Sequence, residues 1–286
     1  MRSSPGSAAA LATLLLCVTL LGGCSRLVDT LFLSPEQGST HSPGALGLEY
    51  EELLFPATDG TQLHGWWLPG AAGQPTVVLL HDGTGNIGAR VDLLRQFHDW
   101  LGVGILIFDY RGFGRSAGTG SDPGMAADVA GARHLARARG WDRRGLVLYG
   151  RGLGAALAAN SAASAPPDGV VLEAVFPDME RLQRARHPLF ASLLAPWLSG
   201  RFDTLKAVAA LRVPALFLHG DRDQQVPIGL GWQVYDACNA PKRFRTIAGA
   251  NHGDTAFTGG ETYWGAWRDF LEEIRETTNN AATPPP

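Results

Sequence analysis

Two residues in the C-terminal third of the chain have side chains that could move a proton. Asp223 lies in the segment HGDRDQQVP, and His252 lies in AGANHGD. A carboxylate that holds a histidine ring lets the imidazole act as a general base. Acid before base is also the order in which the last two members of one type of catalytic triad occur along the chain. The pair therefore predicts chemistry in which a hydroxyl or a water is activated.

The segment that would carry the nucleophile of such a triad lacks one. Gly150-Arg151-Gly152-Leu153-Gly154 follows an apolar run and precedes an alanine-rich stretch. Its outer glycines have the spacing of the nucleophile elbow Gly-x-Ser-x-Gly, a sharp turn from strand to helix in which outer side chains would collide. Gly152 stands where that motif has serine, and glycine has no hydroxyl to form an acyl-enzyme. Because glycine relieves the strain of the turn, the change is not expected to lower stability.

No other side chain is a good substitute for the missing serine. Ser161 and Ser164 lie about two or three turns further along the predicted helix. Ser116 follows a glycine-rich turn and is expected to cap local backbone. Cys238 has no supporting motif and is expected to be a small buried hydrophobe. No cofactor motif is present, and the acid–histidine pair explains Asp223 and His252 better than a metal site does.

The elements that must position these residues alternate between short apolar runs and longer helical stretches. Residues 62–68 alternate as an outer antiparallel strand does. Continuous apolar runs at residues 76–80, 103–108, 145–149, 169–172 and 213–218 favour central parallel strands. Helices are expected near residues 88–100, 123–140, 153–165, 228–238 and 262–275. This order predicts a doubly wound, mostly parallel sheet with helices on both faces, which binds ligands at the carboxyl ends of its strands.

Length and composition favour a single enzyme-sized α/β domain. The chain has 286 residues, a formal net charge of −3 and 45% hydrophobic residues. No basic run stands out, so nucleic acid is not an expected partner.

The N-terminus has the layout of a signal peptide. The apolar run of residues 8–21 is shorter than the roughly 20 residues of a spanning helix. It ends in Leu21-Gly22-Gly23-Cys24, which resembles the lipobox of bacterial lipoproteins. That resemblance implies cleavage before Cys24, lipidation of this cysteine, and anchoring in the outer membrane facing the periplasm. The alternative is a plain secretory signal with an incidental cysteine.

Turn-forming and polar residues mark the limits of the domain. We expect a signal peptide over residues 1–23, a linker over 24–45, the folded domain over 46–275 and a disordered tail over 276–286. Cys17 leaves with the signal peptide and Cys24 carries lipid, so only Cys238 remains and the domain forms no internal disulfide.

Several motifs in the same order resemble one known family. DYRGFGRSAG, LYGRGLGAALA, FLHGDRDQQVP and AGANHGD resemble the bud-emergence-type branch of α/β-hydrolases, which is related to serine aminopeptidases and lipid esterases. HDGTGNIG resembles its HGNAGNIG loop, and the similarity spans about residues 50–272. The resemblance implies the α/β-hydrolase fold, with Asp223 as the acid and His252 as the base. It also implies that the backbone N–H groups of Leu153 and Gly83 form the oxyanion hole.

The chain departs from this family at a second position besides Gly152. Asp82 replaces the glycine that follows the first-loop histidine. A carboxylate there opposes a developing negative charge unless it is paired or points away. Asp178 is a second candidate for the acid that holds His252.

The apolar segment from about residue 176 to 203 is where hydrolases of this fold insert a cap, and its length allows only a short one. These apolar side chains either roof the pocket or pack on the core. By analogy with the fold alone, the ligand is an acyl or peptidyl group.

Three functional interpretations follow from these residues. The first is an envelope lipoprotein that resembles serine esterases and peptidases, has little or no catalytic activity, and keeps its pocket for binding or its surface for a protein partner of unknown kind. The second is a hydrolase of ester or amide bonds that uses water activated by His252 and Asp223. The third is an active hydrolase whose nucleophile was replaced by glycine through engineering. Removing triad members from a serine protease costs about 10⁶ in rate, which disfavours efficient water-based catalysis.

Overall fold

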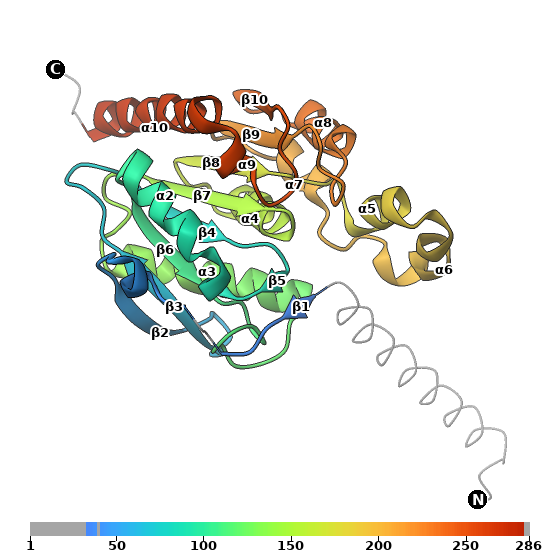
Figure 1. Ribbon diagram of the computed structural model, residues 1–286, viewed down its shortest axis with the longest axis horizontal. Helices are drawn as coiled ribbons and strands as arrows, with labels where there is room; N and C mark the ends of the chain where they lie inside the picture. The colour runs from blue at the N-terminus through green and yellow to red at the C-terminus, as the bar shows by residue number, and fades with distance from the viewer. Residues whose placement is uncertain (1–32, 39–40, 283–286) are drawn as a thin grey trace, which may run out of the picture.

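The sheet at the centre of the molecule has eight strands in the order β10-β9-β8-β7-β4-β6-β3-β2 (Figure 1). This computed structural model describes residues 33–38 and 41–282. All neighbouring strands run parallel except at one edge, where β2 pairs antiparallel with β3 and β3 with β6. The strands are β2 (Glu51–Pro56), β3 (Gln62–Leu68), β4 (Thr76–Leu80), β6 (Gly104–Phe108), β7 (Leu146–Arg151), β8 (Gly169–Glu173), β9 (Ala215–Gly220) and β10 (Lys242–Ile247).

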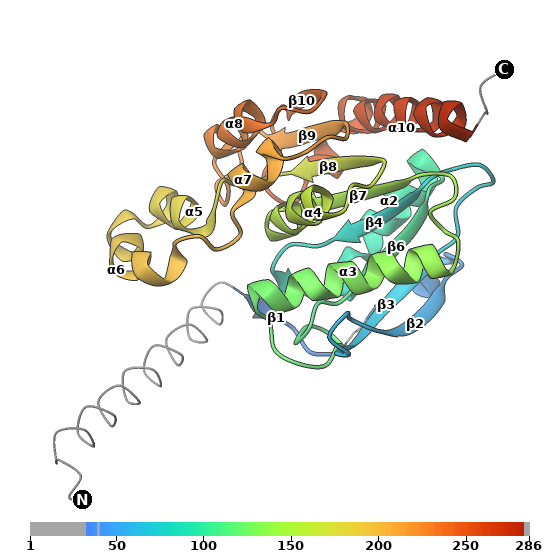
Figure 2. The ribbon, with the colours of Figure 1, turned by 180° about the vertical axis from the view of Figure 1, so that it is seen from behind.

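Helices cover both faces of the sheet, because the side chains of each central strand point alternately to the two faces. Val78 and Leu80 of β4 join one buried cluster, and Val77 and Leu79 join the other. The first cluster is covered by α3 (Asp122–Ala138), α4 (Leu153–Ser164), α7 (Thr204–Ala209) and α8 (Ile228–Ala237). The second is covered by α2 (Val91–Leu101), α9 (Thr255–Thr258) and α10 (Gly260–Ala282). Figure 2 shows α3 and α4 on the face opposite α2. The predicted doubly wound, mostly parallel sheet is confirmed.

Two further helices form the short cap that the sequence predicted. α5 (Met179–Arg186) and α6 (Pro188–Leu198) follow β8 and extend away from the sheet at the carboxyl ends of its strands (Figures 1 and 2). Asp178 caps α5 by accepting a hydrogen bond from the backbone N–H of Arg181. Met179 and Leu182 of α5 are buried, whereas Leu189 of α6 is 91% exposed. The apolar residues of this segment therefore divide between packing inward and facing solvent.

The later part of the predicted linker, which we expected over residues 24–45, is bound to the domain. β1 (Ser34–Pro35) pairs in parallel with β5 (Thr84–Gly85) of the first loop, and Pro43–Leu46 form the short helix η1. The backbone N–H of Ser34 donates to the carbonyl of Gly83 at 2.9 Å. The side chain of Leu33 is buried in the core. A composition of turn residues does not reveal these backbone pairings. The predicted linker therefore extends too far into the folded domain.

The C-terminal helix also passes the predicted end of the domain at residue 275. α10 continues to Ala282, and within it the hydroxyls of Thr277 and Thr278 donate to carbonyls one turn earlier. The start of the predicted disordered tail is therefore wrong. The signal peptide, Cys24 and the last four residues of the tail lie outside the described residues.

Candidate active site

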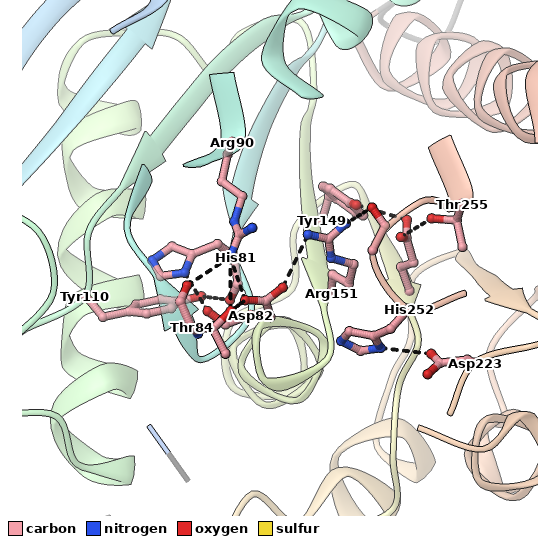
Figure 3. A network of polar contacts seen from close by, with 12 residues as sticks. His81, Asp82, Thr84, Arg90, Tyr110, Tyr149, Arg151, Asp223, His252 and Thr255 are labelled. Carbon is pink, nitrogen blue, oxygen red and sulfur yellow. Dashed lines mark hydrogen bonds and ion pairs between the residues drawn. The ribbon is translucent and has the colours of Figure 1, made fainter. Parts of the chain in front are cut away.

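The acid and the histidine come together at the carboxyl end of the sheet. Asp223 lies in the loop after β9 and His252 in the loop after β10. The Nδ1 atom of His252 is 2.8 Å from Oδ2 of Asp223 (Figure 3). The competing carboxylate, Asp178, instead forms an ion pair with Arg181 beside the cap helix. The predicted contact between Asp223 and His252 is confirmed.

The loop around Asp223 holds this carboxylate in place and ionised. Its Oδ1 accepts from the backbone N–H groups of Gln225 and Val226, each at 2.8 Å. Burial raises the pKa of Asp223, but the hydrogen bonds from His252 and from the Val226 N–H outweigh burial and bring the pKa below its usual value. An ionised carboxylate on Nδ1 leaves Nε2 of His252 free to take a proton from the pocket side.

Gly152 occupies the turn between β7 and α4 with the backbone of a nucleophile elbow. Its φ of 57° and ψ of −116° lie in a region that favours glycine. A Cβ atom placed on Gly152 would be 3.3 Å from Nε2 of His252. A side chain at position 152 would therefore point directly at His252, but glycine has no side chain.

The outer glycines of the elbow are required by contacts. A Cβ on Gly150 would lie 2.0 Å from the carbonyl oxygen of Gly154, and one on Gly154 would lie 2.0 Å from that of Leu80. Both distances are far shorter than any tolerated contact. The structure confirms that side chains at the outer positions would collide, so the turn requires glycine at both of them.

A pocket of about 360 Å³ opens above Gly152 and His252. Its walls are polar near the elbow and partly apolar toward the cap. The lining residues are Ser34, Asp82, Gly83, Thr84, Gly152, Leu153, Phe176, Met179, Leu182, Gln183, Arg186, His187, Gln225, Val226 and His252. The two predicted oxyanion residues, Leu153 and Gly83, therefore line the same pocket as Gly152. Leu153 is the first residue of α4, where backbone N–H groups have no acceptor within the helix.

Asp82 is paired rather than opposed to the pocket. Figure 3 shows its carboxylate between two guanidinium groups, with Arg90 at 2.7 Å and Arg151 at 3.2 Å. Thr84 donates to it from both its backbone N–H and its hydroxyl. Burial raises the pKa of Asp82, but the two arginines outweigh it and lower the pKa to about 2. The negative charge beside the predicted oxyanion hole is thus balanced by neighbouring positive charge.

Arg151 also interacts electrostatically with a second buried carboxylate, that of Glu173. It is only 7% exposed, and its pKa is lowered by burial but raised more by Tyr149, Glu173 and Asp82. Glu173, at the end of β8, accepts hydrogen bonds from the hydroxyls of Tyr149 at 2.9 Å and Tyr263 at 2.7 Å. Arg90, Asp82 and Arg151 therefore form one cluster of ion pairs, and the carboxylate of Glu173 adds to the electrostatic stabilisation of Arg151.

The sequence motifs do not identify Arg90, Arg151 or Glu173 as parts of the site. Arg151 is the variable residue between two elbow glycines, and Arg90 lies eight positions after Asp82. The signal that could have found them is charge: an acid newly placed in a buried loop needs basic partners nearby. Ser34 was missed because it belongs to a segment predicted to be linker.

His81 precedes Asp82 and is enclosed by aromatic rings. Its ring lies 4.3 Å from that of Tyr110, centroid to centroid. Burial and the nearby Arg90 lower the pKa of His81 to about 4, so the ring is neutral at pH 7. This histidine supports the loop and is separated from the pocket. Among the described residues, no three His, Cys, Asp or Glu side chains are grouped to hold a metal ion.

Comparison with known proteins gives relatives over most of the chain. YfhR of Salmonella typhi is 32% identical over 260 residues, which cover 83% of this chain and 85% of YfhR. The α/β-hydrolase domain-containing protein WAV2 of Arabidopsis thaliana is 29% identical over 252 residues, covering 81% and 82% of the two chains. No family model matches the sequence.

The fold is also that of solved hydrolases. An esterase of Pyrococcus furiosus superposes with a TM-score of 0.71 at 19% identity, covering 85% of this chain and 98% of the esterase. At that identity the likeness shows the fold alone. Together with the identity to YfhR and WAV2 over most of the chain, it establishes that this chain belongs to the α/β-hydrolase superfamily.

Proposed function

We propose that this protein is a lipid-anchored envelope protein that uses a hydrolase pocket for binding, with little or no turnover of its own. One observation carries the proposal: the position that faces Nε2 of His252 is Gly152, whose added Cβ would lie 3.3 Å from that atom. With no hydroxyl there, the acyl-enzyme route is closed at the elbow. The ligand class that fits the fold is an acyl or peptidyl group, since the pocket joins polar backbone near the elbow to apolar side chains of α5.

A second function has its own supporting observation. The pair of Asp223 and His252 is fully formed, with 2.8 Å between Nδ1 and Oδ2, and His252 lines the pocket. A water held near Nε2 could be activated by this pair and attack an ester or amide directly. Such a route lacks the covalent intermediate that splits a difficult step in two, so it should be slow.

Ester hydrolysis separates the two functions. The unmodified protein should hydrolyse p-nitrophenyl acetate and octanoate no faster than His252→Ala does, because neither can form an acyl-enzyme at the elbow. Efficient hydrolysis that disappears in His252→Ala would overturn the binding proposal in favour of the water mechanism.

Binding has a direct measurement of its own. A ligand that binds only the folded state raises stability by RT ln(1 + [L]/Kd), so decanoate should raise the midpoint of thermal unfolding. Leu182 is buried on α5 and lines the pocket, so Leu182→Asn should reduce this rise. An equal rise in both proteins would place the ligand elsewhere.

The proposed anchor is tested by mass. Mature protein extracted from its native membrane should begin at Cys24 and carry added acyl mass. A mature chain that begins at another residue, or that lacks added lipid, would contradict the anchor.

A further inference from the structure

The second cap helix, α6, has one large apolar side chain that the rest of the domain leaves almost fully exposed. Its sequence over Pro188–Leu198 is PLFASLLAPWL, which contains no charged side chain. Leu189 is 91% exposed, a larger exposed fraction than any other large hydrophobic side chain in the described part of the chain. The main packing partner of α6 is α5, and Figures 1 and 2 show both helices extending beyond the sheet. Leu189 is therefore free to contact a surface outside the domain.

Basic residues flank this apolar helix. Between residues 178 and 206 there are five basic and three acidic side chains, whereas the whole chain has a formal net charge of −3. Arg181 and Arg184 of α5 are 53% and 57% exposed and form ion pairs with Asp178 and Glu180. Arg186 is also exposed and lines the pocket. Apolar and basic side chains side by side are typical of surfaces that lie on an anionic bilayer.

The start of the described chain lies at the same pocket as the cap. Ser34 of β1 lines the pocket together with Leu182, Arg186 and His187. The proposed lipid anchor, Cys24, precedes Leu33 by nine residues, which span at most about 30 Å even when fully extended. An anchor at Cys24 therefore keeps Leu33, the residue next to the pocket-lining Ser34, within this distance of the membrane.

We propose that α6, with the arginines of α5, docks on an anionic membrane surface and turns the pocket mouth toward the bilayer. This inference rests on the proposed anchor at Cys24 and adds a second contact with the membrane. In this arrangement α6, with its 11 residues, lies along the membrane surface, and Leu189 enters the boundary between headgroups and acyl chains. A ligand with an acyl chain then reaches Met179 and Leu182 directly from the bilayer.

The test places a reporter on the cap of the anchored protein. Leu189→Cys is labelled with the environment-sensitive dye NBD in full-length protein that has been processed and extracted from membranes. Leu54→Cys is the matched control, because Leu54 is 71% exposed on the edge strand β2. The remaining cysteine, Cys238, is buried and should not react. Both proteins are reconstituted into vesicles of phosphatidylethanolamine with phosphatidylglycerol, or of phosphatidylcholine alone.

Docking predicts a blue shift and a rise of about twofold or more in NBD emission at position 189 on the anionic vesicles, with no change at position 54. The double variant Arg181→Gln, Arg184→Gln should weaken the response at position 189, as should high salt. Circular dichroism confirms that each variant remains folded.

Three outcomes overturn the docking. The NBD emission at position 189 could remain that of a label in water while the protein floats with the vesicles. This result would support the anchor and contradict the docking. The label could already be shielded before vesicles are added, which indicates that a second copy of the chain covers α6. A protein that does not float with vesicles at all contradicts both the anchor and the docking. Ester turnover, measured separately, reports on the proposed binding function alone.

Discussion

The two sides of the pocket differ in how much of a hydrolase they retain. On the side of β9 and β10, Asp223 and His252 form a complete acid–histidine pair at 2.8 Å. On the side of β4 and β7, the serine position is Gly152 and the first loop carries Asp82 between two arginines. One side carries the groups that can activate a nucleophile, and the other has glycine at the centre of the elbow beside buried ion pairs. The turn between β7 and α4 thus has the backbone of an elbow with glycine at its central position.

The backbone explains why this is possible. The elbow depends on Gly150 and Gly154, whose positions admit no Cβ, and on a positive φ at position 152. Serine is the strained residue at that position and glycine the relaxed one. Glycine at position 152 therefore carries no backbone strain, and the close contacts at Gly150 and Gly154 do not depend on a side chain there.

The largest effect should come from restoring the nucleophile. Gly152→Ser places a hydroxyl beside Nε2 of His252, and turnover of p-nitrophenyl esters should rise by about 10³-fold. A complete triad raises the rate by about 10⁶-fold, and we expect only part of this factor to be recovered. Gly152→Ala adds the Cβ without the hydroxyl and should gain nothing. No gain in a folded Gly152→Ser variant would mean that the pocket has diverged beyond the elbow.

The next largest effect should come from breaking the cluster of ion pairs. Asp82→Ala removes the shared partner of Arg90 and Arg151, and an uncompensated buried charge costs about 3–5 kcal/mol. Chemical unfolding measures the loss. Asp99→Ala, which removes the acid of an exposed pair with Arg95, should leave the midpoint unchanged. An equal and small effect in both variants would show that the cluster carries no stability.

Acid should weaken the same side of the pocket. The folded-state pKa of His81 is about 4, below its ordinary value of 6.5, so its contribution is present above pH 6.5 and is lost as pH falls through about 4. The loss is about 3 kcal/mol at 1.36 kcal/mol per pH unit. His81→Asn keeps a side-chain N–H but does not titrate, so its unfolding free energy should fall less over that range. Parallel curves for the two proteins would contradict the assignment.

The smallest effect should be the cost of the serine itself. Because residue 152 has a φ of 57°, Gly152→Ser and Gly152→Ala should each lower the unfolding free energy by about 1 kcal/mol. Similar losses in the two variants would separate the strain of the Cβ from the chemistry of the hydroxyl. A stabilised variant would mean that the elbow is not strained.

The sequence predicted the fold and one side of the site better than the other. Apolar runs such as TVVLL and GLVLY are long enough to be central strands, and glycine spacing marks the elbow, so these features are local. The same motifs predicted the contact between Asp223 and His252, because both follow neighbouring strands.

What the sequence could not predict depends on partners far apart in the chain. The pairing of Asp82 with Arg151 spans 69 positions. The residues around each of them form no local pattern that predicts the contact. The pairing of Ser34 with the first loop likewise spans about fifty positions. The sequence therefore predicts a linker where the structure has strand β1. Threonines and asparagines are poor helix formers, so the sequence predicts an end of the domain at residue 275, whereas α10 continues to Ala282.

The most direct test of the central claim is covalent labelling at the elbow. A fluorophosphonate probe reacts with a serine only when an adjacent histidine activates it and the oxyanion site is intact. Mass spectrometry should find the unmodified protein unlabelled, Gly152→Ser labelled at position 152, and the Gly152→Ser, His252→Ala double variant unlabelled. Labelling of the unmodified protein at any residue would contradict the claim that the site lacks only its nucleophile, as would the absence of label in a folded Gly152→Ser variant.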